Sequence, residues 1–362
     1  MERSPFPYHG PLEAEQVSGR EDMVIELSQR IADRRVTALL GPRRFGKTSL
    51  LKRVAADLEQ VGPQPVWVDF YELNSMSDLV GALDRGLAAV TGSLRRIIDS
   101  VAGGVSVNLG VVGMELRRDK RHRPDPVDML RRLLGILVES AQRQDVFVVF
   151  DEFAGIAGVE GAAGLLRTEL QHHYQDLGLV FAGSQPSMMR TLFSDQTQPF
   201  FGQADLIEIP PLSDNALLEI VVDGFDRTDR DPGAVARRIV AMADGHPQRG
   251  MQLADAVWRN TAESAVADEL AWADALEEVR ASVDLGSERM YSLLSGGQKK
   301  TLRVIAGDGS IYGAAAAVLD LAPGTARAAT ETLEGNGFLA RRDELVIVDP
   351  MLRDWIRRRF PI

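Results

Sequence analysis

Residues 41–49 combine residue types at a spacing that can bind phosphate. An apolar run, residues 36–40, precedes them and a periodic apolar run begins at Leu50, so the expected order is strand, loop and helix. Glycines at both ends of the loop let the backbone curl until successive N–H groups face an anion, and the start of the helix adds its positive dipole end. This G-x-x-x-x-G-K-[ST] pattern predicts a phosphate loop made of Gly41, Pro42, Arg43, Arg44, Phe45, Gly46, Lys47, Thr48 and Ser49.

Two residues of the phosphate loop have specific expected roles. Lys47 reaches the β- and γ-phosphates of a nucleotide as a point charge, and the hydroxyl of Thr48 is a ligand for Mg²⁺. The alternative is a glycine turn that carries a lysine by chance. The expected strand and helix on either side of the loop count against that alternative.

Polar residues with matching chemistry end two other apolar runs. Residues 146–150 lead directly into Asp151, which is expected to order Mg²⁺, and Glu152, which can polarise a water molecule. Residues 177–183 lead into Ser184, which either touches the γ-phosphate or the attacking water, or only caps its strand. A surface carboxylate pair is the alternative for Asp151 and Glu152. Asp69, at a further strand end, either influences Glu152 or caps that strand.

The elements that position these residues alternate along the first 212 residues. Strands are expected at 36–40, 65–70, 146–150, 177–183 and 206–209, with helices between them, which predicts an α/β parallel sheet. Residues 1–20, rich in proline, glycine and aromatic residues, are expected to form an extended arm. Residues 93–123 are interpreted as an insertion, with a β-hairpin over 105–116 and a basic run over 117–123.

The remainder of the chain has a different pattern. Helices are expected over 213–223, 232–243, 248–260 and 263–283, which makes residues 213–285 an all-helical unit. Residues 286–362 show helical patterns over 297–306, 310–319 and 323–335 and then a hairpin of residues 338–340 and 344–348. Three helices followed by a hairpin is the order of a winged-helix domain.

Composition excludes several classes of function. The chain of 362 residues has a net charge of −11 and no cysteine, so a chain-wide basic surface, disulfides and thiolate chemistry are all absent. No signal pattern or membrane-length apolar run is present, and we expect a cytoplasmic protein without a membrane partner. His122, His172 and His173 show no metal-ligand spacing.

Taken together, the motifs resemble those of the STAND and archaeal-type ATPases, relatives of the AAA+ proteins of origin recognition. In chain order, the matching pieces are residues 19–21, the phosphate loop, residues 146–153, residues 183–184, residues 245–247 and the winged-helix-like tail. The resemblance covers nearly the whole chain. It implies a P-loop NTPase (AAA+-like) parallel sheet, a helical lid and a winged-helix domain.

The resemblance also implies a ligand and site roles. The cofactors would be ATP or ADP together with Mg²⁺. The adenine would be bordered by Arg20, Glu21 and Pro247, and Ser184 would sense the γ-phosphate. Related proteins place an arginine before the last strand to reach a neighbour's γ-phosphate, whereas residues 200–205 contain none. We therefore expect slow hydrolysis unless Arg190, Arg249 or a partner supplies that charge.

Residues 294–298 spell the signature of the ABC transporter ATPases, but they follow the Asp-Glu strand instead of preceding it. We therefore interpret Ser295 as a helix N-cap and not as a sign of transporter kinship.

Three functions remain open at this stage. The first is a nucleotide switch, with Glu152 as the base of a slow ATPase and with a protein partner or self-association. The second is a DNA-associated AAA+ ATPase of initiator, loader or defence type, and the third is a scaffold that binds nucleotide without hydrolysis. The expected winged helix offers few cations for DNA, so protein docking is favoured over DNA contact. These cations are Arg327, Arg341, Arg342, Arg353, Arg357, Arg358 and Arg359.

Overall fold

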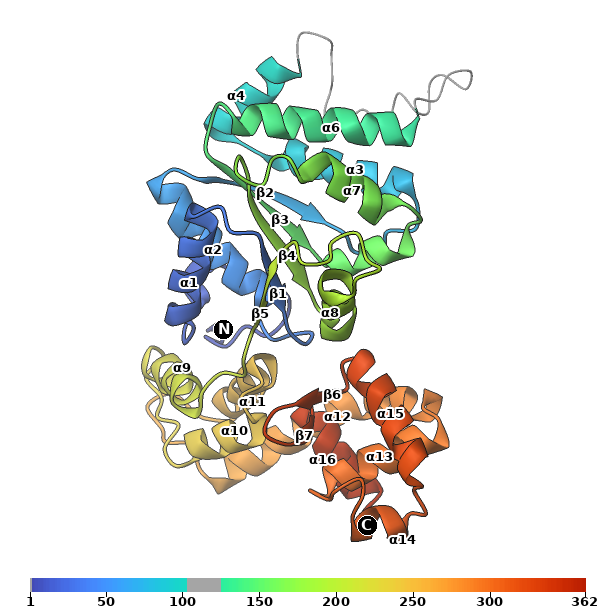
Figure 1. Ribbon diagram of the computed structural model, residues 1–362. Coiled ribbons are helices and arrows are strands. Elements are labelled where there is room, and N and C mark those ends of the chain that lie inside the picture. The colour runs from blue at the N-terminus through green and yellow to red at the C-terminus, as the bar shows by residue number, and fades with distance from the viewer. Residues whose placement is uncertain (1, 103–124) are drawn as a thin grey trace, which may run out of the picture.

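The computed structural model describes residues 2–102 and 125–362, and its first half is built on a five-stranded parallel sheet (Figure 1). The strands lie in the order β2-β3-β4-β1-β5, and every neighbouring pair is parallel. Their bounds are β1 Thr37–Leu40, β2 Gln64–Asp69, β3 Val146–Asp151, β4 Gly178–Gly183 and β5 Asp205–Glu208. The predicted α/β parallel sheet is confirmed, with each strand within a few residues of its expected place.

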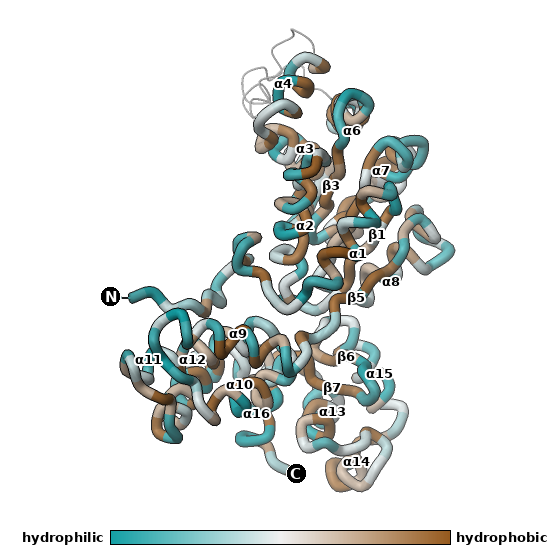
Figure 2. Tube along the Cα trace, turned by 90° about the vertical axis from the view of Figure 1, so that its left-hand side faces the viewer, coloured by the Kyte–Doolittle hydropathy of each residue, from teal (hydrophilic) through white to brown (hydrophobic). Residues whose placement is uncertain are grey.

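The apolar strands form because both faces of the sheet are covered by helices. Neighbouring residues of one strand enter different cores: Leu39 packs toward α1 (Glu21–Ala32) and α2 (Lys47–Val61), and Leu40 toward the opposite face. In Figure 2 the backbone trace of the strands is largely coloured as hydrophobic where the strands run among the helices. The helices of the opposite face are α3 Met76–Ala89, α4 Gly92–Val101, α6 Pro126–Ala141, α7 Ala162–Leu170 and α8 Pro186–Ser194, with the 3-10 turn η2 Phe153–Gly158 after β3.

The strand order decides where chemistry can occur. Because β1 lies between β4 and β5, and β3 is next to β4, the residues that follow β1, β3 and β4 meet at one edge of the sheet. The phosphate loop, Asp151 with Glu152, and Ser184 occupy those three places.

The N-terminal arm is more than an extended segment. It contains the 3-10 turn η1 Ala14–Gln16, and Phe6 is buried in the core of the following helical unit, with its ring centroid 5.5 Å from that of Phe225. Further along, the N–H of Leu12 donates to the hydroxyl of Ser49 at 3.0 Å. The arm therefore joins the start of α2 to the helical unit.

The helical unit consists of α9 Asp214–Asp226, α10 Val235–Ala243, α11 Pro247–Arg259 and α12 Glu269–Leu293. The helix expected over 263–283 starts and ends later than predicted. Asp268 accepts hydrogen bonds from the N–H groups of Leu270 and Ala271 and so fixes the start of α12, while Val266 bridges to Asp231. The expected boundary between residues 285 and 286 falls inside α12.

The C-terminal unit contains α13 Gly296–Ala306, α14 Ala314–Val318, α15 Pro323–Gly335, the antiparallel strands β6 Leu339–Arg341 and β7 Leu345–Ile347, and α16 Pro350–Arg359. The expected order of helices and hairpin is confirmed, although α14 is shorter than the predicted 310–319. Ser295 is the N-cap of α13, and Gln298 returns a hydrogen bond to it, so the cap interpretation is confirmed.

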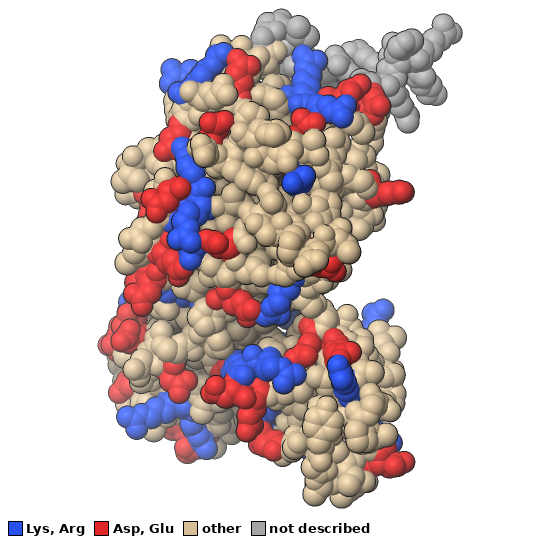
Figure 3. All heavy atoms as spheres, in the orientation of Figure 1, with Lys and Arg blue, Asp and Glu red and all other residues tan. Residues whose placement is uncertain are grey.

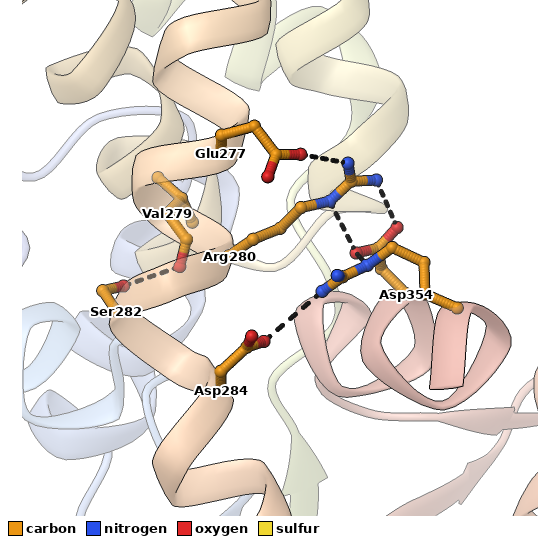
Figure 4. Close-up of polar contacts among 7 residues, drawn as sticks. Glu277, Val279, Arg280, Ser282, Asp284 and Asp354 are labelled. Carbon is orange, nitrogen blue, oxygen red and sulfur yellow. Dashed lines mark hydrogen bonds and ion pairs between the residues drawn. The ribbon is translucent and has the colours of Figure 1, made fainter. Parts of the chain in front are cut away.

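Ion pairs fasten α16 to α12. Arg280 donates two hydrogen bonds to Asp354, at 2.9 and 2.8 Å, and also pairs with Glu277 (Figure 4). Arg358 bridges Asp354 and Asp284. These contacts hold the C-terminal unit beside the second half of α12.

Two predicted features need separate mention. Of the insertion expected over 93–123, residues 93–101 belong to α4, whereas the expected β-hairpin and basic run lie outside the described residues. Among the helices that the structure describes, none is both long and apolar enough to cross a membrane.

Candidate functional site

The phosphate loop has the local geometry that its glycines predict. Gly46 has a φ of 85° and Arg44 a φ of 67°, so two residues of the loop adopt the left-handed conformation that curls the backbone. At the other end, a Cβ on Gly41 would lie 2.1 Å from the Cγ2 of Ile209. Gly41 is therefore required by close packing against the residue that follows β5, and Gly46 by its backbone angle.

Lys47 begins α2 and is held under the loop. Its ammonium group donates to the carbonyls of Gly41 at 2.7 Å and Pro42 at 2.8 Å, and the residue is only 5% exposed. Burial lowers the pKa of Lys47 to about 8, against the opposing attraction of Glu152 and Asp151. The group is thus a fixed cation at neutral pH, with one N–H left for an anion.

Thr48 and Asp151 are in direct contact. The Thr48 hydroxyl donates to the Oδ2 of Asp151 at 2.8 Å, and the N–H of Glu152 donates to the other carboxylate oxygen at 2.9 Å. Burial raises the pKa of Asp151, while these two hydrogen bonds oppose the shift. The structure therefore brings Lys47, Thr48 and Asp151 to one place, from two separate strands of the sheet.

The donor set fits Mg²⁺ as a partner of phosphate. Mg²⁺ is usually held by one or two protein oxygens together with water and substrate phosphates. Thr48 and Asp151 offer that number, with hard oxygen atoms already adjacent. In the described part of the chain no group of three or more His, Asp and Glu could hold a metal ion, so a cage made only of protein ligands is not found there.

Glu152 is tied to the end of the neighbouring strand. One of its carboxylate oxygens accepts from the Ser184 hydroxyl at 2.7 Å and from the Ser184 N–H at 3.2 Å, and Glu152 itself has a φ of 49°. Asp69 accepts from the N–H of Tyr71 at 2.9 Å, which is a local cap, and its charge contributes to the raised pKa of Asp151. Ser184 thus contacts the expected base, a partner that the sequence pattern did not indicate.

A cavity of about 550 Å³, here called the loop cavity, opens over the phosphate loop. Glu152 and Ser184 line one side of it, and residues 43–49 form its base. The opposite wall comes from two unexpected sources, the N-terminal arm at residues 7–12 and the helical unit. The wall residues of the helical unit are Leu212, Ile220, Pro247, Gln248 and Met251.

Between the arm and α11, apolar residues line a slot in the wall of the loop cavity, and one hydrogen bond joins the two segments. Gln248 donates to the carbonyl of Tyr8 at 3.0 Å, which connects α11 to the arm beside Pro247 and Met251. The composition of the arm was visible in the sequence, because prolines and aromatic rings gather there. Its contact with α11 was not, because it joins residues 240 positions apart.

Of the three residues implied to border an adenine, Arg20 and Pro247 line the loop cavity and Glu21 does not. Arg20 lines the loop cavity and donates to the carbonyl of Phe45 at 3.3 Å, and burial lowers its pKa to about 10. Pro247 also lines the cavity, as the first residue of α11. Glu21 does not line it. Its carboxylate accepts from the N–H of Gly19 at 3.0 Å and so supports the turn before α1.

His246 joins the helical unit to the phosphate loop. It caps α11 by accepting from the N–H of Arg249, and its ring lies edge-on to that of Phe45 with centroids 5.0 Å apart. Burial lowers the pKa of His246 to about 4, so the ring is neutral at physiological pH.

The two arginines expected as substitutes for a neighbour's arginine are both engaged elsewhere. Arg190 forms an ion pair with Glu208 at the end of β5. Arg249 donates to both carboxylate oxygens of Asp349, at 3.0 and 2.6 Å. Neither guanidinium lines the loop cavity.

Solved structures resemble the chain over nearly its full length. The Walker-type ATPase PABY2304 of Pyrococcus abyssi matches with a TM-score of 0.73 at 20% identity, over 98% of this chain and 99% of that one. The fold is therefore that of the AAA+ P-loop ATPases. The ADP form of the ORC2 protein of Aeropyrum pernix matches with a TM-score of 0.54 at 14% identity, over 98% and 97% of the two chains. The ORC1 protein of the same organism, solved in complex with DNA, matches with a TM-score of 0.51 at 15% identity, over 95% and 93%.

No family model and no curated protein matches the sequence of this chain. At 20% identity and below, the structural likeness shows the fold. The function has to be argued from the site.

Proposed function

We propose that the protein is a slow, Mg²⁺-dependent ATPase that acts as a nucleotide switch. One observation carries this proposal: Lys47 and Thr48 lie at the base of one cavity that Glu152 and Ser184 also line, and Thr48 donates a hydrogen bond to Asp151 behind it. A surface carboxylate pair or an incidental glycine turn would not produce that convergence.

The chain's own residues divide the binding of ATP among them. The phosphate loop and Lys47 take the phosphates, and the slot between the arm and α11 is large and apolar enough for an adenine base. Mg²⁺, when bound beside Thr48 and Asp151, would neutralise charge on the phosphate oxygens. Asp151 keeps its carboxylate aligned through the hydrogen bonds from Thr48 and from its own neighbour's N–H.

For hydrolysis, Glu152 is the proposed general base. Its carboxylate is held by Ser184, so we propose that the Ser184 hydroxyl changes partner from Glu152 to the γ-phosphate when ATP binds. That exchange would release a lone pair of Glu152 for the attacking water. It would also give Ser184 the sensor role that the resemblance implies.

The switch would be read out through α11 and the C-terminal unit. Pro247 and Gln248 line the loop cavity, while Arg249, the next residue of α11, holds Asp349 at the start of α16. Movement of α11 on ATP binding or hydrolysis would therefore be transmitted to the C-terminal unit. The proposal includes a winged-helix character for that unit, which the order of its helices and hairpin supports. It also includes STAND kinship and the docking of a protein partner or a second copy.

The charges of the C-terminal unit weigh against the DNA-associated alternative. Three of the expected contact residues pair with acids: Arg341 with Glu334, Arg342 with Asp244, and Arg357 with Asp308. On the face drawn in Figure 3, the surface of this unit is mostly uncharged, with scattered groups of both signs. The Aeropyrum pernix ORC1 structure with DNA supports this alternative only by analogy of fold.

Two substitutions with matched controls test the proposal. Lys47→Ala should abolish ATP binding in an equilibrium titration, whereas Lys52→Ala, on the exposed side of the same helix, should leave it intact. Glu152→Gln should keep ATP bound and slow phosphate release by about 10²–10⁴-fold. The control for that variant is Glu160→Gln, at an exposed site outside the loop cavity.

Other outcomes would favour the alternatives. Unchanged ATP affinity in Lys47→Ala would remove the proposal altogether. If both wild type and Glu152→Gln bind ATP but release no measurable phosphate, the protein is the scaffold that binds nucleotide without hydrolysis. Turnover stimulated by duplex DNA, and lost with salt and with Arg341→Ala, would favour the DNA-associated ATPase.

A further inference from the structure

Two arginines of the phosphate loop stand apart from the other cations near the site. Arg43 and Arg44 are exposed, and both lie on the wall of the loop cavity. Within the described residues neither guanidinium has an ion-pair or hydrogen-bond partner. Arg190 and Arg249, in contrast, are each neutralised by an acid.

Neighbouring positions place the two guanidinium groups in different surroundings. The charge of Arg43 acts on the ammonium of Lys47, whereas the charge of Arg44 acts on His246 at the start of α11. Because such interactions weaken with distance, they favour Arg43 over Arg44 as the arginine nearer to the phosphate-binding ammonium, although both arginines line the loop cavity.

Arg44 also borders a second cavity, of about 860 Å³, between the phosphate loop and the C-terminal unit. Arg43 lines that cavity too, together with Ser184 and Gln185. The two loop arginines therefore stand where the loop cavity opens toward the second cavity, on the same side as Ser184 and its partner Glu152.

The segment expected to carry an arginine toward a neighbouring subunit has none to offer. Phe200 is fully buried, and Asp205 at the end of this segment binds Arg30 and Arg35. Charge that develops on the γ-phosphate oxygens during transfer still needs a cation beyond Lys47. Arg20 also lines the loop cavity, but it is buried and donates to the carbonyl of Phe45, whereas Arg43 is exposed there and, within the described residues, pairs with no acid.

We propose that Arg43 is a catalytic residue that contacts the γ-phosphate of ATP in cis and stabilises it during hydrolysis. The inference rests on the proposed ATPase function and adds a residue to it. In the reaction, the oxygen of water forms a bond to the γ-phosphorus, the bond to the β–γ bridging oxygen breaks, and ADP leaves with that electron pair. Glu152 takes the proton of the water, and Arg43 stays protonated throughout.

An exposed arginine outside the loop cavity makes a matched experiment possible. Arg43→Ala should slow single-turnover hydrolysis of ATP by at least about 10²-fold, the usual effect of losing one transition-state contact. Affinity for ADP should change by less than about fivefold, as expected for loss of an exposed charge. The control is Arg190→Ala, at an exposed arginine that pairs with Glu208 and does not line the loop cavity, and it should hydrolyse ATP at close to the wild-type rate.

A second measurement separates catalysis from simple attraction of the nucleotide. Binding of ADP with aluminium fluoride, which imitates the transferring phosphoryl group, should weaken in Arg43→Ala far more than binding of ADP alone. Arg43→Lys should recover only part of the loss, because an ammonium lacks the planar fork of the guanidinium. Added guanidinium ion at millimolar concentration should restore turnover in Arg43→Ala.

Several outcomes would overturn the assignment. Turnover of Arg43→Ala within a few-fold of wild type, or an equal loss in Arg190→Ala, would do so. Equal weakening of ADP and of ADP with aluminium fluoride would reduce Arg43 to a surface charge. If wild type binds ATP but is too slow to measure, the aluminium fluoride comparison still decides. Failure of wild type to bind ATP would instead remove the proposed function itself.

Discussion

Among the described residues, an ion pair joins Arg249 of α11 to Asp349, the N-cap of α16, and its removal should weaken the contact between the helical and C-terminal units. Arg249 and Asp349 are bound through two hydrogen bonds of 3.0 and 2.6 Å, with side chains 9% and 29% exposed. Asp349 also caps α16 by accepting from the N–H of Met351 at 3.0 Å. One carboxylate therefore serves both the contact between units and the start of a helix.

The expected magnitude follows from that burial. Breaking a buried pair by removing one partner costs about 3–5 kcal/mol, because the other charge is left uncompensated. Asp349 keeps some access to water, so we expect Arg249→Ala to lower the free energy of unfolding by about 3 kcal/mol, at the low end of that range. Asp349→Asn retains a good capping oxygen and loses only the charge. In a double-mutant cycle the two substitutions should show a coupling of about 2 kcal/mol.

The assay is urea denaturation followed by tryptophan fluorescence, since Trp258 and Trp272 report on the helical unit and Trp355 on α16. Arg327→Ala is the matched control, because Arg327 and Glu331 form a solvent-exposed pair on α15 whose loss should leave the free energy of unfolding unchanged within error. A coupling between Arg249 and Asp349 no larger than that of the control pair would refute this account of the junction.

Two further predictions concern the phosphate loop and its neighbours. His246 is neutral in the folded protein, with a pKa of about 4 against 6.5 for the free side chain, so the unfolded chain binds a proton first as the pH falls. The stability contributed by the neutral His246 ring is fully present above pH 6.5 and declines by about 3 kcal/mol toward pH 4. The variant His246→Asn, which keeps a cap, should flatten that part of a stability profile measured by urea denaturation. Gly41→Ala places a Cβ against Ile209 and should lower the free energy of unfolding by about 1–3 kcal/mol. Gly135→Ala, in open space on α6, should raise it, so thermal unfolding of the two variants should show shifts of opposite sign. A Gly41→Ala variant as stable as wild type would refute the packing argument.

The core of the site was predictable because its determinants are local. The phosphate loop depends on glycines and a lysine within a few residues, and Asp151 with Glu152 ends an apolar strand whose type is evident from its composition. The parallel sheet follows from the alternation of strands and helices, and it brings these separate segments to one edge.

What could not be predicted depends on contacts between residues far apart in the chain. The N-terminal arm forms a wall of the loop cavity because Phe6 is anchored in the helical unit and because Tyr8 and Leu12 bind residues far along the chain. The hydrogen bond from Ser184 to Glu152, and the engagement of Arg249 by Asp349, depend on how strands and helices pack. Composition and spacing carry no signal for such pairs, so Arg249 was considered for the phosphate although it is bound elsewhere.

The central claim is that Lys47, Thr48 and Asp151 hold one nucleotide triphosphate with its metal. A crystal structure of Glu152→Gln with ATP and Mn²⁺, in which anomalous scattering locates the metal, tests it most directly. We predict the metal within about 2.2 Å of the Thr48 hydroxyl oxygen and beside the Asp151 carboxylate, with the Lys47 ammonium on the γ-phosphate. Nucleotide bound elsewhere, or a metal away from both oxygen ligands, would contradict the account.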